Sequence, residues 1–160
     1  MLSLEWLENT PLGLIARESM WGFQILVAIH IMAIVLSAGL VFWFDLRLLG
    51  VTLRRWPIGA FYRRLAPWML TGFAVMFASG ALLFVGFATK AYPNIYFRLK
   101  MSAILLGGIN ALVFHFLTER QLAGWDQGNT PRSARLAGAI SISVWTFAIL
   151  MGRMMAYTMY

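Results

Sequence analysis

Cysteine is absent from this 160-residue chain. Its absence excludes disulfides, thiolate metal sites, iron–sulfur clusters and covalent c-type haem attachment. Charge is also scarce, because charged residues make up 12% of the sequence and hydrophobic residues 61%, whereas about 25% of a soluble domain is charged. The composition is typical of a protein inside a lipid bilayer. We therefore interpret the net charge of +7 as a topology signal and not as a sign of nucleic-acid binding.

Several catalytic patterns are missing as well. The sequence has no nucleophile-elbow serine, no phosphate-binding loop and no zinc-ligand spacing, which excludes the commonest hydrolases and nucleotide-dependent enzymes. The long apolar runs contain no acidic residue. A proton relay through the membrane needs such a residue, so this pattern argues against proton transport.

Four apolar runs are long enough to cross a bilayer as helices, which takes about 20 residues each. These predicted spans cover residues 21–44, 66–88, 97–117 and 136–157. Four prolines lie at or near the predicted boundaries: Pro57, Pro67, Pro93 and Pro131. The sequence therefore predicts an all-α fold, a polytopic four-helix membrane bundle that forms one domain over residues 1–160.

Arginine distribution predicts the orientation of the bundle. Two segments between the spans, 45–65 and 119–135, carry eight arginines: Arg47, Arg54, Arg55, Arg63, Arg64, Arg120, Arg132 and Arg135. Loops rich in basic residues stay in the cytoplasm, so we expect both termini to be external. The first 20 residues lack a basic start and a continuous apolar stretch. They predict a short interfacial amphipathic segment and no cleaved signal peptide.

Two histidines, His30 and His115, lie within apolar spans. Each is either a neutral side chain hydrogen-bonded across the bundle or a ligand for haem iron. The stretch from His30 to the first inner charge at Asp45 spans about 22 Å of helix, whereas that from His115 to Arg120 spans about 7 Å. The two imidazoles thus differ in depth by about 15 Å. We expect them to serve separate metal sites, and so one or two haem b groups.

The same counting places Gly80 and Met151 at the depth of His30. Gly80 would give a flat macrocycle access to the helix backbone, or would simply allow helix packing, as would Gly72 and the pair 107–108. Met151 is a candidate thioether ligand or a residue that fills the core. Both residues are retained as candidate cofactor contacts.

Three cations, Arg98, Lys100 and Arg153, gather near the external ends of the third and fourth spans. They would pair with haem propionates, because guanidinium groups bind carboxylates in a bidentate manner. The alternative is that they reach outward to lipid phosphates. Lys100 would also reach inward, towards His30.

The run AIHIMAIVLSAGLVFWFDLRLLG, with NIYFRLKMSAILLGGINALVFH and a final GRMMAY, resembles a family of uncharacterised four-helix bacterial inner-membrane proteins. The layout is more distantly similar to the four-helix haem-binding protoporphyrinogen oxidase and to the copper-resistance D-type membrane proteins. The likeness to the oxidase implies that His30 and Lys100 are the positions tied to haem. It also implies a multi-pass protein of the bacterial inner (plasma) membrane.

The main hypothesis is a membrane-embedded b-type haem protein, a small cytochrome that transfers electrons between membrane or periplasmic redox partners. One alternative is a protoporphyrinogen- or quinol-oxidising membrane enzyme, so whether the chain is an oxidoreductase enzyme stays open. Another is a cofactor-free accessory subunit of a larger membrane complex. Membrane lipid and a redox protein or quinone are the expected partners, and both a homo-oligomer and a subunit of a larger complex remain open.

Overall fold

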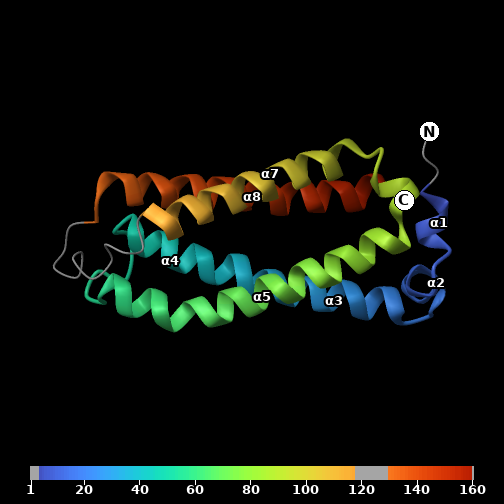
Figure 1. Ribbon diagram of the computed structural model, residues 1–160, viewed down its shortest axis with the longest axis horizontal. Coiled ribbons are helices and arrows are strands. Elements are labelled where there is room, and N and C mark those ends of the chain that lie inside the picture. Colours follow the sequence, from blue (N-terminus) through green and yellow to red (C-terminus); the bar gives the residue numbers. More distant parts are fainter. Residues whose placement is uncertain (1–3, 118–129, 160) are drawn as a thin grey trace.

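The computed structural model describes residues 4–117 and 130–159, and all regular structure in these two stretches is helical. Four helical segments are long and apolar enough to cross a membrane: Gly22–Leu48, Ile58–Gly86, Ile95–Phe116 and Arg132–Thr158. The predicted all-α membrane bundle is confirmed, and the chain is a multi-pass membrane protein. Both termini lie at one end of the bundle (Figure 1). We name this the outer end and the opposite one the inner end, and the compartments they face stay a prediction.

The first span is one continuous helical segment. It consists of α3 (Gly22–Ile34), a π-helical turn η1 (Val35–Gly39) and α4 (Leu40–Leu48). The sequence predicts its end at residue 44, where the first charge follows, but the helix continues through the inner end because apolar residues resume directly after Asp45. The correction moves Asp45 from a loop into the membrane-spanning segment.

The other three spans begin earlier than predicted, and their far ends lie within two residues of the predicted ones. They are α5 (Ile58–Gly86), α7 (Ile95–Leu117) and α8 (Arg132–Thr158). Pro57 and Pro131 directly precede α5 and α8, where a missing backbone donor is harmless. The expectation that Pro67 marks a boundary is wrong, because this residue lies inside α5. Arg120 and the rest of residues 118–129 lie outside the described residues.

The spans form two antiparallel pairs (Figure 1). In one pair α7 packs along α8, and in the other α3 and α4 pack on α5, while α4 also contacts α8. Two apolar clusters hold the pairs together. The central cluster contains Ala33, Met76, Ala103, Trp145 and Ala148. The inner cluster contains Phe44, Leu48, Ile58, Phe114 and Ala134.

Glycines allow two close contacts between helices. A Cβ on Gly72 would lie 2.7 Å from the backbone nitrogen of Ser37, so the backbones of α5 and η1 touch directly. A Cβ on Gly107 would lie 3.1 Å from the ring of Trp145, whereas one on Gly108 would have no neighbour within 4 Å. Close backbone approach gains van der Waals energy, which drives helix association in lipid. The prediction of small residues at helix contacts therefore holds for Gly72 and Gly107.

The N-terminal segment forms two short helices, α1 (Glu5–Glu8) and α2 (Pro11–Glu18), at the outer end of α5. The buried Glu8 carboxylate accepts hydrogen bonds from the backbone nitrogen (2.8 Å) and the hydroxyl (2.6 Å) of Thr89, and it pairs with Arg17 at 3.2 Å. Burial acts to raise the pKa of Glu8, but the Thr89 bonds and the charge of Arg17 outweigh it and hold the pKa below its ordinary value. An ionised Glu8 thus fastens α1 to α6 (Ala88–Ala91).

Candidate functional site

The imidazole of His30 joins the first two spans in the outer half of the bundle. Its Nδ1 lies 2.9 Å from the hydroxyl oxygen of Ser79 on α5. When that hydroxyl donates its one proton to the carbonyl of Val75, 2.7 Å away, its oxygen can only accept from His30. In this arrangement the imidazole carries its proton on Nδ1. Its Nε2 keeps a lone pair, which is the form that binds a metal or takes up a proton.

Gly80 makes room for the His30 ring itself. A Cβ on Gly80 would lie 3.0 Å from the Cε1 atom of His30, which is closer than nearly all real contacts of this kind. Because Gly80 has no side chain, the imidazole packs directly against the backbone of α5 at this point. The space that the sequence analysis gave to a macrocycle at this position is filled by the histidine.

Lys100 enters the same level of the bundle from α7. Its side chain is half-buried and packs over Gly152 of α8, where a Cβ would lie 3.6 Å from its Cδ and 3.7 Å from its Nζ. Its charge lies close enough to His30 to interact with it electrostatically. The structure therefore brings together His30, Lys100 and Gly80, from two different helix pairs.

The other residues predicted to contact a cofactor lie at a similar depth in the bundle but outside the group formed by His30, Lys100 and Gly80. Arg98 and Arg153 are exposed, and Arg153 contacts Tyr157 of its own helix through its hydroxyl (2.9 Å) and its ring face (4.6 Å). Both arginines occupy positions from which a cation reaches lipid headgroups. Met151 is half-buried on α8.

His115 lies far from the outer site. It is exposed on α7 near the inner end, with its ring edge-on to Phe116 at a centroid distance of 5.3 Å. About 22 Å of helix separates it from Lys100. The structure thus keeps His30 and His115 at separate levels.

Asp45 is the ionisable group that the sequence analysis missed. It lies inside the first span, its residue is 4% exposed, and its Oδ2 atom receives no hydrogen bond within the described parts of the chain. The expectation that the spans contain no acidic residue is therefore wrong. The apolar residues that follow Asp45, at positions 46, 48 and 49, were the signal that the span continues.

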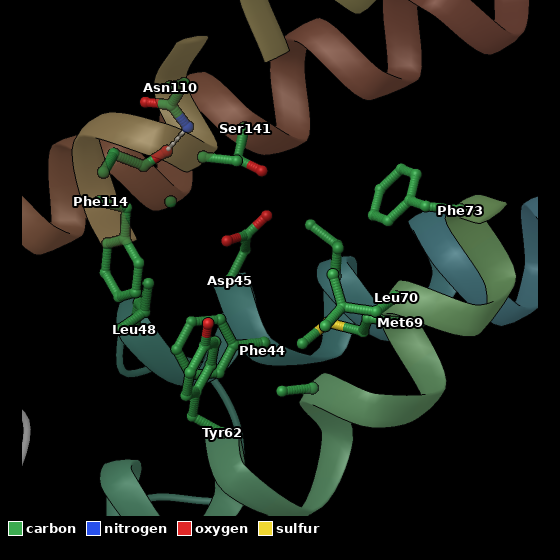
Figure 2. Close-up of a pocket in the computed structure, with 15 residues that line it drawn as sticks. Phe44, Asp45, Leu48, Tyr62, Met69, Leu70, Phe73, Asn110, Phe114 and Ser141 are labelled. Atoms are coloured by element: carbon green, nitrogen blue, oxygen red, sulfur yellow. Dashed lines mark hydrogen bonds between the residues drawn. The ribbon is translucent and has the colours of Figure 1, made fainter. Parts of the chain in front are cut away.

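A cavity of about 200 Å³ lies beside Asp45. Figure 2 shows the Asp45 side chain reaching from α4 towards Ser141 of α8, with Leu70 of α5 across the open space and Tyr62 beside Phe44 below it. Ser141 is close enough to act on the carboxyl as a hydrogen-bonding neighbour. Asn110 lines the same cavity and donates to the carbonyl of Ala137, 3.1 Å away, which fastens α7 to α8.

Arg47, two residues after Asp45, has a structural role. Although it is charged, it is only 5% exposed. Its guanidinium donates to the carbonyl of Trp56 from Nε (3.0 Å) and Nη2 (2.8 Å), and to that of Arg54 at 3.3 Å. It therefore closes the loop between α4 and α5 and serves as more than a topology signal.

The chain belongs to the family of unknown function DUF6644, whose model matches residues 3–158. No curated protein and no solved structure matches it. The expected membership in an uncharacterised family of membrane proteins is confirmed in this form. Because the family carries no assigned activity, function has to be argued from the two groups of ionisable residues.

Proposed function

We propose that this protein is a membrane-embedded b-type haem protein of the bacterial inner membrane that transfers electrons between membrane or periplasmic redox partners. The observation that supports it is the contact between His30 and Ser79, in which Nδ1 lies 2.9 Å from the hydroxyl oxygen. When Ser79 donates to Val75, this contact places the proton on Nδ1 and leaves a lone pair on Nε2. A neutral imidazole in this form is the usual axial ligand of haem iron.

The surroundings of His30 match what a ligating histidine needs. Histidines that bind metals almost always donate their other ring nitrogen to a protein acceptor, which fixes the orientation of the ring. Ser79 has this role, and it is itself 3% exposed and anchored to Val75. The ring is further held by its close contact with Gly80. His30 is thus orientated before any ligand arrives.

Lys100 supplies the charge that a haem site requires. Haem contributes one-electron chemistry, and its two propionates need cationic partners in a low-dielectric site. Lys100 lies half-buried at the level of His30, while Arg98 and Arg153 would reach carboxylates at the outer surface only.

The test is the haem content of the purified protein, measured as a pyridine haemochrome per chain together with the Soret band. We expect wild type to carry haem and His30→Ala to lose it, while His115→Ala retains the haem bound at the outer site. Size-exclusion chromatography and circular dichroism show that each variant is folded. A folded, colourless wild-type protein after expression with ample haem supply would overturn the proposal.

A further inference from the structure

One oxygen of the Asp45 carboxyl group lacks a partner in a place where a partner is needed. It lies within the membrane-spanning part of α4 and is almost fully buried, and its Oδ2 receives no hydrogen bond in the described chain. A buried polar group without a hydrogen bond is costly, and such groups inside membranes are usually functional. Its neighbour Ser141 offers a single hydroxyl.

The cavity beside Asp45 has the size and lining for one ring. Aromatic side chains of Phe44, Tyr62 and Phe114 pack against each other at its inner end, with centroid distances of 5.2 to 6.4 Å. Its volume of about 200 Å³ exceeds the ~150 Å³ of an apolar cavity that binds benzene. The space therefore accommodates a substituted six-membered ring.

The cavity opens towards lipid. Two residues that line it, Leu70 on α5 and Ala111 on α7, are exposed on the outside of the bundle. Exposed apolar residues in the middle of a spanning helix face the hydrocarbon of the bilayer. A ligand therefore enters sideways from the membrane, between α5 and α7.

The polar groups of the cavity do not suit a bare cation. A hard cation takes about six or more oxygen ligands, whereas Asp45 and Ser141 lie in a mainly apolar lining and the amide nitrogen of Asn110 is used on Ala137. One strong acceptor in an apolar, aromatic space instead suits a ring with a hydrogen-bond donor.

We propose that this cavity binds the hydroxylated ring of a membrane quinol, with the Asp45 carboxyl accepting the hydrogen bond of a ring hydroxyl. The aromatic side chains would pack on the ring, and the portal between Leu70 and Ala111 would admit it from the bilayer. The proposal goes beyond the haem site, because it uses the opposite half of the bundle and none of the residues of that site.

The experiment compares a short-chain benzoquinol with its dimethyl ether, which has the same ring and no hydroxyl donor. Equilibrium binding to the purified protein in detergent is measured anaerobically for both. We expect wild type to bind the quinol about tenfold more tightly than the ether, which corresponds to one additional buried hydrogen bond. In Asp45→Leu, which leaves no acceptor at this position, the quinol should bind about tenfold less tightly, and the preference over the ether should largely disappear.

A second variant tests the portal without touching Asp45. In Ala111→Phe a large side chain at the mouth should weaken both ligands, whereas Leu112→Phe, at an exposed neighbouring position outside the cavity lining, should bind as wild type does. No binding to wild type, or equal binding of quinol and ether, overturns the proposal. His30→Ala should still bind the quinol, so failure of the haem proposal and failure of this one are distinguishable.

Discussion

The outer and inner halves of the bundle differ in how tightly their ionisable side chains are packed and hydrogen-bonded. In the outer half His30 is fixed by Ser79 and packed against Gly80, and Lys100 lies over Gly152. In the inner half Asp45 keeps an oxygen without a partner beside an open cavity. Tight packing around His30 holds one ligating atom, Nε2, in place. Loose packing around Asp45 instead leaves a cavity that can hold an entire ligand.

The largest effect is expected from filling the contact at Gly80. In Gly80→Leu the new side chain must displace His30, because even a Cβ would lie 3.0 Å from its ring. We expect the haem content to fall more than tenfold and the free energy of unfolding to fall by ~1–3 kcal/mol. The haemochrome assay measures the haem content, and SDS titration measures the free energy of unfolding. Gly108→Leu is the matched control, since a Cβ there meets nothing, and an equal loss in both variants would contradict the tight outer contact.

A substitution at Asp45 in the inner half should raise stability, whereas the one at Gly80 lowers it. In Asp45→Leu a carboxyl with one unpartnered oxygen is replaced by an apolar group next to an apolar cavity. We expect the free energy of unfolding to rise by ~1–3 kcal/mol, the usual cost of an unsatisfied buried group. Asn110→Leu removes a satisfied hydrogen bond and should lower stability in the same SDS titration. A loss of stability in Asp45→Leu would show that the carboxyl is paired.

A smaller effect is expected at Ser79. Ser79→Ala removes the acceptor of His30 and should lower the free energy of unfolding by ~1 kcal/mol. It should also release the imidazole from its fixed tautomer. Nitrogen-15 NMR of the His30 ring in haem-free protein reports this directly, with the proton on Nδ1 in wild type and a mixture of tautomers in the variant. An unchanged spectrum would remove the basis for the lone pair on Nε2.

The sequence predicts the membrane fold well because each span is a local property. About 20 apolar residues specify a helix in lipid whatever they contact, and the depth of His30 and His115 follows from counting along such helices. The burial of Asp45 is not local. It depends on packing between α4 and α8, and a rule that ends a span at its first charge discards this residue before its neighbours are known.

Two contacts at the outer end show the same limit. The sequence places Gly80 opposite His30, but only the fold shows that the imidazole itself occupies the space. Likewise Glu8 belongs to a segment predicted as an amphipathic lead-in, and its partner Thr89 is far away in the chain. Pairings between distant segments of this kind carry no signal in composition or periodicity.

The smallest effect is expected at Glu8, and it tests whether the outer end opens independently of the inner half. The pKa of Glu8 is held below the ordinary value of 4.5. Its contribution to the stability of the outer end is therefore present above about pH 4.5 and is lost as the pH falls through the lowered pKa. Hydrogen exchange of α2 amides, corrected for intrinsic rates, should show protection that decreases about threefold from pH 6 to pH 3.

The controls for this titration lie in the same segment. Glu8→Gln should lack the pH dependence, because the amide cannot ionise. Glu18→Gln, which changes an exposed acid that also pairs with Arg17, should keep it. Amides of α4 around Asp45 should stay protected over the same range, since no contact in the described chain links Glu8 to the inner half. If α2 and α4 lose protection together, the two halves open as one unit, and the contrast between a tight outer site and a loose inner one does not extend to their stability.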